Sequence, residues 1–326
     1  MKRINSHRIA AQNIKDHFEA NRGRYSLIYS EIPPNDMALT CAKFAKSEGI
    51  PYVADINDLW PEAMRMALNV PVLSDVAFYP FARDAHKVYG LLDAVVGTSD
   101  EYAARAGRDR KDPYKHITVY VGNDLAVFDQ GVADFAESIE KPEGEVWAAY
   151  AGTLGKSYDI ATLVRAANAL KDICPQLRVK ILGDGPDRHD LEKLAESLQA
   201  PVDFLGYQDY AHMAAWLHKS DITVNSLVRK APQSIVTKIG DYLASGNPMI
   251  NTGSSPEMRR KTETDGFGVN VWAEDVEQLA QVLGALAFDE DLRKAMGAKA
   301  RAIAEEQFDQ GQAYKRIVAL VDDLIG

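Results

Sequence analysis

Short apolar runs alternate with longer stretches of helical periodicity along most of this chain. In the first half the apolar runs are rich in β-branched and aromatic residues, which predicts strands over 26–29, 52–55, 94–97 and 117–120. Between two of them, 37–48 repeats apolar residues every three to four positions, as an amphipathic helix does. Strands and helices that alternate in this way are typical of a parallel α/β sheet.

A polar, acidic stretch over 129–145 interrupts this alternation and contains the turn sequence Lys-Pro-Glu-Gly, so we interpret it as an interdomain linker. The alternation then restarts, with strands predicted over 146–151, 178–182, 202–205, 222–225 and 248–250, and helices over 276–286 and 313–325. The predicted organisation is an abridged N-terminal Rossmann-like domain over 1–140 and a second Rossmann-like domain over 141–308. We expect a final helix over 309–326 to pack back on the N-terminal domain.

The first domain is called abridged because of how the sequence opens. A complete doubly wound domain usually begins with a strand and a glycine-rich turn within about 20 residues. Here the pattern over 1–24 is that of a basic amphipathic helix instead. We therefore expect the first βα unit to be missing, either because the chain is a fragment or truncated product or because the domain is naturally short.

Composition narrows the class of protein. The chain has 326 residues, of which 46% are hydrophobic and 26% charged, which suits two soluble globular domains. No run approaches the roughly 20 apolar residues that span a bilayer, and the N-terminus is too polar for a signal peptide. With two cysteines, Cys41 and Cys174, a disulfide framework is not expected, and we predict a cytoplasmic protein.

The distribution of charge bears on possible partners. A net charge of -10 argues against nucleic-acid binding, which needs a basic face. The segments 1–24 and 105–116 are nonetheless basic, and either could contact an anionic membrane surface on the cytoplasmic side. The alternative is a solvated helix face and a solvated loop.

The first segment with candidate chemistry follows the strand predicted over 146–151. Gly152 and Gly155 are followed by Lys156, and a helix is predicted to begin near Ile160. Glycines allow a ligand to approach the backbone closely, and a helix N-terminus offers unpaired N–H groups to an anion. The segment therefore predicts a phosphate-binding loop, with an ordinary glycine turn as the alternative.

A second loop, over 181–186, follows the next predicted strand and contains Gly183, Asp184 and Gly185. The carboxyl edge of a parallel sheet is where open α/β folds bind ligands, and this loop is expected at that edge. A tight turn with Asp184 as a local cap would give the same sequence pattern.

The third segment, 232–250, places Lys238 and Asp241 one turn apart on a helix that Gly246 ends. A cation and a carboxylate so placed could hold a diphosphate and a ribose diol. The alternative is a surface ion pair between the two side chains.

Taken in this order, and with the run over 204–227, these segments resemble the C-terminal domain of glycosyltransferase family 4, whose members are retaining enzymes of the GT-B fold. The similarity covers 146 to about 308. Upstream, Asp-Ile-Asn-Asp-Leu-Trp-Pro-Glu at 55–62 looks like a D-x-W-P-E segment of the subgroup that builds bacterial surface polysaccharides. Val-Gly-Asn-Asp at 121–124 looks like a distorted Pro-Asn-Gly hinge loop. The resemblance implies two Rossmann-like domains facing across a cleft.

The resemblance also implies roles for individual residues. Lys156, Lys238 and Asp58 would be catalytic, and Asp55 and Trp60 would face the acceptor from the N-terminal domain. The nucleotide-sugar donor would contact Gly152, Thr153, Leu154, Gly155, Gly183, Asp184, Gly185, Gly206, Tyr207, Gln208, Gln233, Ser234, Ile235, Val236, Thr237 and Asp241. In this set Asp241 would bind the ribose where the family uses glutamate, and Ser234 to Thr237 would meet the phosphates.

Three departures from the family pattern stand out. Gln233 and Asp241 occupy the positions of two glutamates, and Thr153 replaces a frequent arginine, which leaves Lys156 and Lys238 to neutralise a diphosphate. The family's glycine-rich acceptor loop near the N-terminus has no counterpart.

The implied function is retaining transfer of a sugar from a nucleotide-sugar, with UDP as the expected nucleotide, to a glycan or lipid-linked acceptor in polysaccharide biosynthesis. We expect no metal or other cofactor, because the seven histidines show no ligand spacing. The alternatives are a non-catalytic sugar-nucleotide-binding relative that lost its acceptor loop and epimerisation of a UDP-sugar. A dinucleotide oxidoreductase fits less well, because neither glycine turn reads G-x-G-x-x-G.

Overall fold

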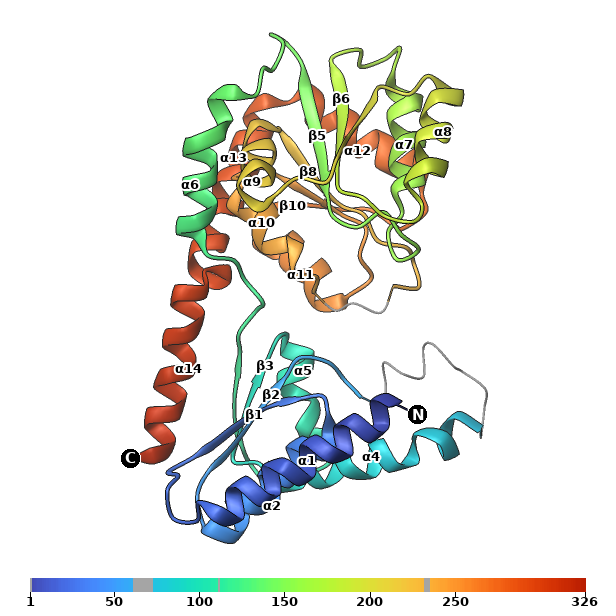
Figure 1. The fold of residues 1–326 in the computed structure, drawn as a ribbon. Helices are drawn as coiled ribbons and strands as arrows, with labels where there is room; N and C mark the ends of the chain where they lie inside the picture. The colour runs from blue at the N-terminus through green and yellow to red at the C-terminus, as the bar shows by residue number, and fades with distance from the viewer. Residues whose placement is uncertain (1, 61–72, 111, 232–234) are drawn as a thin grey trace. The chain divides into compact units, whose positions relative to one another are not determined.

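The computed structural model describes all residues except 1, 61–72, 111 and 232–234 (Figure 1). The chain divides into two compact units, each with its own parallel sheet. The first comprises Met1–Tyr120 together with Tyr314–Gly326, and the second comprises Val121–Ala313.

The first unit is built on a four-stranded sheet in the order β1-β2-β3-β4, with every neighbouring pair parallel. Its strands are β1 (Ile28–Ile32), β2 (Tyr52–Ile56), β3 (Ala94–Gly97) and β4 (Lys115–Thr118), which confirms the four strands expected from the sequence. The described helices are α1 (Lys2–Ala20), α2 (Asn35–Glu48), α4 (Leu73–Leu91), α5 (Asp100–Ala104) and the 3₁₀ turn η1 (Arg105–Arg108). The core lies between the sheet and α1, α2 and α4, where the rings of Phe18 and Phe44 stack at 4.3 Å.

The second unit has a six-stranded parallel sheet in the order β10-β9-β8-β5-β6-β7. Its strands are β5 (Val146–Ala151), β6 (Leu177–Leu182), β7 (Val202–Gly206), β8 (Ile222–Asn225), β9 (Met249–Asn251) and β10 (Gly268–Asn270). The chain adds strands on one side of β5 and then returns to add β8 on its other side. This reversal makes the carboxyl ends of β5 and its neighbours the expected binding edge.

Helices cover both faces of this sheet (Figure 1). They are α6 (Leu125–Phe135), α7 (Ile160–Leu170), α8 (Arg188–Leu198), α9 (Tyr210–Lys219), α10 (Lys238–Ala244), α11 (Pro256–Thr264), α12 (Val276–Phe288) and α13 (Glu290–Ile303), with the turns η2 (Ala136–Ser138) and η3 (Ala304–Phe308). Successive side chains of β5 point to opposite faces, as a strand requires. Val146, Ala148 and Tyr150 join the core under α7 and α12, whereas Trp147 packs with Ala215 of α9.

The boundary between the units lies earlier than the predicted linker. Residues 129–145 contain the second half of α6, and α6 packs on α9, with Gly131 against the backbone of Ala211 and Phe135 stacked on His212 at 3.9 Å. Two of the acidic residues that suggested a linker, Asp129 and Asp134, belong to α6, and Asp129 pairs with Arg301 of α13 at 2.7 Å. This segment therefore belongs to the second unit.

The last helix, α14 (Gln310–Ile325), begins in the second unit, and Tyr314–Gly326 group with the first. There Asp323 forms an ion pair with Lys115 of β4. Among the described residues, no helix combines the length and apolar character needed to cross a lipid bilayer.

Replacing Ile250 by Ala should lower the free energy of unfolding of the second unit by about 2–5 kcal/mol, because Ile250 is fully buried in its core. Ile173 is the matched control, since its side chain is 68% exposed and its truncation should change stability by about 0.5 kcal/mol or less. Urea unfolding followed by tryptophan fluorescence measures both. Equal losses for the two variants would contradict this description of the core.

Candidate functional site

Two glycine loops meet at the carboxyl edge of the second sheet. The loop after β5 and the loop after β6 touch through their backbones, because a Cβ on Gly183 would lie 1.9 Å from the carbonyl oxygen of Gly152. A Cβ on Gly185 would likewise lie 2.2 Å from the carbonyl oxygen of Leu154. Gly152 and Gly183 also have φ of 148° and 132°, values that other residues rarely adopt. Glycine is therefore required at these positions by space and by backbone conformation.

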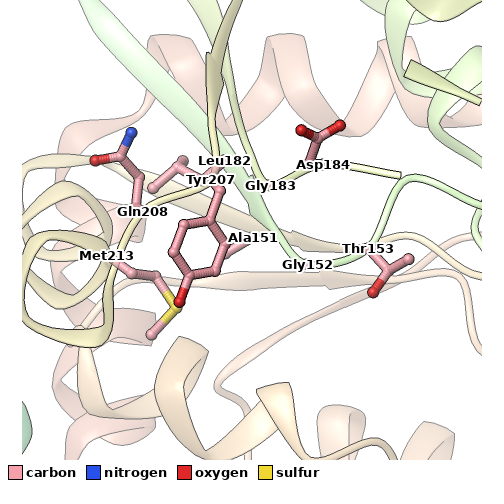
Figure 2. Close-up of a pocket in the computed structure, with 9 residues that line it drawn as sticks. All are labelled: Ala151, Gly152, Thr153, Leu182, Gly183, Asp184, Tyr207, Gln208 and Met213. Atoms are coloured by element: carbon pink, nitrogen blue, oxygen red, sulfur yellow. The ribbon is translucent and has the colours of Figure 1, made fainter. Parts of the chain in front are cut away.

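A pocket of about 280 Å³ opens beside this contact (Figure 2). It is lined by Ala151, Gly152, Thr153, Leu182, Gly183, Asp184, Tyr207, Gln208 and Met213. The ring of Tyr207 is 78% exposed and stands at the pocket near Met213, as Figure 2 shows. An exposed aromatic ring over a pocket offers a flat face on which a planar base can stack.

Lys238, the first residue of α10, lies behind the first glycine loop. Its Nζ donates a hydrogen bond to the Tyr150 hydroxyl at 3.0 Å and lies 2.5 Å from the place that a Cβ on Gly152 would occupy. Burial lowers the pKa of Lys238 to about 7. In the described part of the chain Lys238 forms no ion pair, so the expected alternative of a Lys238–Asp241 pair is not found.

Asp241 has other partners. Its Oδ1 accepts hydrogen bonds from the Tyr210 hydroxyl at 2.9 Å and from Asn123 Nδ2 at 3.0 Å. Burial raises the pKa of this carboxyl group, and the two hydrogen bonds partly offset that effect. Both bonds reach the same oxygen, so the described residues leave Oδ2 for a further hydrogen-bond donor. The sequence did not indicate Tyr210, although Asn123 lies in the segment that resembles a hinge loop.

The side chain of Lys156 lies at the surface of the second unit. Its side chain is 89% exposed and pairs with Asp187 Oδ1 at 2.8 Å, and the Asp187 carboxylate raises the pKa of Lys156. Like Lys238 and Asp241, it is not among the residues that line the pocket. A diphosphate would have to compete with Asp187 for this ammonium group.

The other predicted donor residues have varied places. Leu154 is fully buried in the core and can offer a ligand only its backbone. Gly206 accepts a hydrogen bond from the backbone N–H of Gly183 at 2.7 Å, which ties β7 to the second glycine loop. Ile235, Val236 and Thr237 directly precede α10, and the side chain of Val236 is buried. Gly155 lies in the first glycine loop. Gln233 and Ser234 lie outside the described residues. The sequence analysis missed Ala151, Leu182 and Met213, of which the first two are the last residues of strands.

The predicted acceptor residues Asp55, Asp58 and Trp60 lie at the carboxyl end of β2 in the first unit or directly after it. Asp55 Oδ2 accepts a hydrogen bond from the Tyr29 hydroxyl at 2.7 Å, and burial raises the pKa of Asp55. Asp58 accepts from Trp60 Nε1 at 3.2 Å and from the backbone N–H of Leu59 at 2.8 Å. The two carboxylates therefore share one edge of the sheet, each held by a neighbour.

Within the described residues, no group of three His, Cys, Asp or Glu side chains is arranged to hold a metal ion. The expectation that no cofactor is needed stays a prediction.

Comparison with known proteins identifies the second unit. Residues 146–289 match the family model "Glycosyl transferases group 1", so the chain contains a domain of this group. A mannosyltransferase from Corynebacterium glutamicum, described as GDP-mannose-dependent and acting on a monoacylated phosphatidylinositol monomannoside, is 29% identical over 45% of this chain and 39% of its own length. "Putative colanic acid biosynthesis glycosyl transferase WcaI" from Escherichia coli is 26% identical over 59% of this chain and 47% of its own length. The chain thus spans less than half the length of either curated relative.

Solved structures show the same fold across both units. Anabaena Alr3699/HepE in complex with UDP has a TM-score of 0.73 at 15% identity and covers 97% of this chain and 81% of its own. Sucrose-phosphate synthase from Thermosynechococcus elongatus has a TM-score of 0.70 at 17% identity, and the match covers 96% of this chain and 78% of the synthase. WaaG, a glycosyltransferase involved in lipopolysaccharide biosynthesis, has a TM-score of 0.60 at 14% identity, and the match covers 94% of this chain and 93% of WaaG. These matches confirm the GT-B fold class.

The backbone contact between the loops can be tested with Gly183→Ala. The new Cβ would meet the Gly152 carbonyl at a φ that alanine rarely adopts, so we expect a loss of about 2–4 kcal/mol in the stability of the second unit. Gly144→Ala is the control, because Gly144 has φ of 83° but no atom within 4 Å of its Cβ position, and should cost about 1 kcal/mol. Thermal unfolding compares the two, and a smaller loss for Gly183→Ala would show that the loops do not touch as described.

Proposed function

We propose that this chain, whose second unit is a group 1 glycosyltransferase domain, transfers a sugar from a UDP-sugar to a glycan or lipid-linked acceptor with retention of configuration. The observation that carries the proposal is the place of Lys238. Among the described residues this half-buried ammonium group has no carboxylate partner, and it lies directly behind a glycine loop that lines a pocket. Such a group favours an anionic ligand, because the attraction to an anion offsets the free-energy cost of keeping the ammonium charge away from water.

The pocket and the neighbouring residues of α10 offer a separate contact to each part of a nucleotide. The base would stack on Tyr207, the diphosphate would meet the backbone of Gly152 and the ammonium group of Lys238, and the ribose hydroxyls would donate to Asp241. Structures of HepE are described with UDP and with UDP-glucose, which supports UDP as the nucleotide. The mannosyltransferase relative is described as GDP-mannose-dependent, so GDP-mannose is the competing donor.

In the proposed reaction the bond between the sugar C1 and the diphosphate oxygen breaks, and a bond from C1 to the acceptor oxygen forms on the same face. The acceptor hydroxyl proton leaves with the diphosphate or to solvent. Negative charge develops on the departing phosphate, where Lys238 and backbone N–H groups would stabilise it without a metal ion. Asp55, Asp58 and Trp60 are the proposed acceptor contacts, and the WcaI relative supports a role in polysaccharide biosynthesis.

One observation favours a second candidate, a sugar-nucleotide-binding protein without transferase activity. Lys156, expected on the diphosphate, is paired with Asp187 instead. The two candidates agree on donor binding and differ in turnover, so one set of measurements separates them.

The first test is donor binding and its dependence on Lys238. UDP-glucose at a hundredfold excess over its dissociation constant should stabilise the chain by about 2.7 kcal/mol, measured by thermal shift. Lys238→Ala should reduce this stabilisation and lower turnover by about 10²–10³-fold, because it removes the cation that faces the leaving phosphate. EDTA should leave turnover unchanged, and NMR of the product should show the donor's anomeric configuration.

The control is Lys294→Ala, since Lys294 is an exposed residue of α13 paired with Glu290 and should not affect binding or turnover. If neither UDP-sugars nor GDP-mannose stabilise the chain, the proposed function is wrong. Donor binding without transfer to any glycan or lipid-linked acceptor would leave the second candidate.

We also propose that the protein works in the cytoplasm, with peripheral contact to the inner face of the membrane through the basic segments 1–24 and 105–116. Vesicles with a high content of anionic lipid should then pellet the chain at low salt, whereas neutral vesicles should not. Replacing Arg8 and Lys15 of α1 by glutamate should reduce pelleting several-fold. Equal pelleting with neutral vesicles would contradict an electrostatic contact.

A further inference from the structure

Two tyrosine rings enclose the ammonium group of Lys238. Its Nζ lies 4.3 Å from the centroid of the Tyr150 ring and 3.9 Å from that of Tyr158. The two rings meet edge to face, with centroids 6.0 Å apart and an interplanar angle of 64°. Both distances are within the roughly 6 Å over which a cation is attracted to the face of an aromatic ring.

The described groups in contact with this ammonium carry no opposite charge. Tyr150 comes from β5, Tyr158 from the loop before α7, and Tyr242 from α10, where its hydroxyl is engaged with the backbone of Ala151. Asp241 also belongs to α10, but its carboxylate is bound by Tyr210 and Asn123. In the described part of the chain, the aromatic faces and the Tyr150 hydroxyl are therefore what stabilises the cation.

The Tyr150 hydroxyl also connects the cation to the glycine loop. It accepts a hydrogen bond from Lys238 Nζ at 3.0 Å and donates one to the carbonyl oxygen of Thr153 at 2.8 Å. One of the three ammonium donors is thus used, and the position of the cation is fixed relative to the backbone that lines the pocket.

Aromatic rings and carboxylates hold a lysine in different ways. A carboxylate neutralises the ammonium group, and an incoming phosphate must displace it, as at Lys156 and Asp187. An aromatic ring attracts the cation through its quadrupole and leaves the charge available to an anion.

We propose that Tyr150 and Tyr158 are positioning residues that form an aromatic clamp and reserve the charge of Lys238 for the diphosphate of the donor. This inference rests on the proposed function, and it assigns to Tyr150 and Tyr158 the task of keeping the ammonium group of Lys238 available to the diphosphate.

The clamp predicts a pH dependence of donor binding. Burial lowers the pKa of Lys238 to about 7 in the free chain, and a bound diphosphate raises it by favouring the charged form. The protonated form therefore binds best, so the dissociation constant should be flat below about pH 7 and rise as the pH increases above it. The phosphates of a nucleotide-sugar do not titrate in this range, so the dependence reports on the protein.

The experiment measures the dissociation constants of UDP-glucose and GDP-mannose by calorimetry from pH 6 to pH 9. Tyr158→Leu should weaken binding about tenfold at pH 6.5 and move the start of the pH-dependent rise to lower pH, because the ammonium loses an aromatic face. Tyr158→Phe keeps the ring and should match the unaltered chain in both respects. Lys238→Met should bind weakly with no rise across the range.

Two further variants keep the test decisive. Tyr158→Met fills the same space with an unbranched apolar chain and is measured in parallel, so that misfolding of the leucine variant does not remove the comparison. Tyr150→Phe should bind about fivefold more weakly with the pH profile retained, because it removes the hydroxyl and keeps the ring.

Each outcome has a distinct meaning. If Lys238→Met weakens binding while Tyr158→Leu and Tyr158→Met match the unaltered chain, the clamp is wrong and the proposed function stands. Equal loss in Tyr158→Phe and Tyr158→Leu would also overturn the clamp, since the ring face would then be irrelevant. If the unaltered chain binds neither nucleotide-sugar, both proposals fail together.

Discussion

The contact between the backbones of Gly152 and Gly183 is the constraint on which the candidate site depends. At this point two loops from neighbouring strands come so close that no side chain fits between them. The pocket lies beside this contact, and Lys238 reaches the space left by the missing side chain of Gly152. A bulkier residue at either position would displace the loop, the cation or both. The close approach of the two loop backbones therefore determines where the ammonium group of Lys238 can lie.

Helix α10 carries two half-buried ionisable groups, and the structure stabilises each differently. Asp241 receives two hydrogen bonds on one oxygen, so neutral donors orient it and partly offset the rise in its pKa that burial causes. Lys238 is held by aromatic faces and one hydroxyl. Neither group neutralises the other, although they are one helical turn apart. This arrangement supports the proposal that the cation and the carboxylate bind separate parts of one nucleotide diphosphate.

Much of the fold could be predicted from the sequence because the signals are local. A short apolar strand followed by an amphipathic helix needs only a window of residues, and every strand expected in the first half is found. The packing of α6 on α9 could not be predicted in the same way. The stretch predicted to be a linker begins at Asp129, in the middle of α6, and its acidic residues suggested exposure to solvent. The partner of Asp129, Arg301, is far away in the chain.

The candidate site was predictable by position but not by side-chain direction. The glycines lie where expected because glycine reports directly on backbone conformation. Leu154 and Lys156 lie in the expected loop, yet one packs into the core and the other pairs with Asp187, since a motif does not fix which way a side chain turns. The aromatic surroundings of Lys238 were not predicted, because Tyr150 is distant in sequence and its ring could equally have been an ordinary core residue.

The departures from the family pattern are consistent with recognition that depends largely on the backbone. If the loops bind a diphosphate mainly through N–H groups, the change to Thr153 removes one charge without removing the loop. Asp241 is one methylene shorter than the glutamate expected at this position, and Tyr210 and Asn123 each donate a hydrogen bond to its Oδ1. Asn123 is itself held by backbone hydrogen bonds with Phe308 and Gln310. The shorter carboxylate is thus oriented by hydrogen-bonded neighbours before a ligand arrives, and such preorganisation lowers the entropy cost of binding.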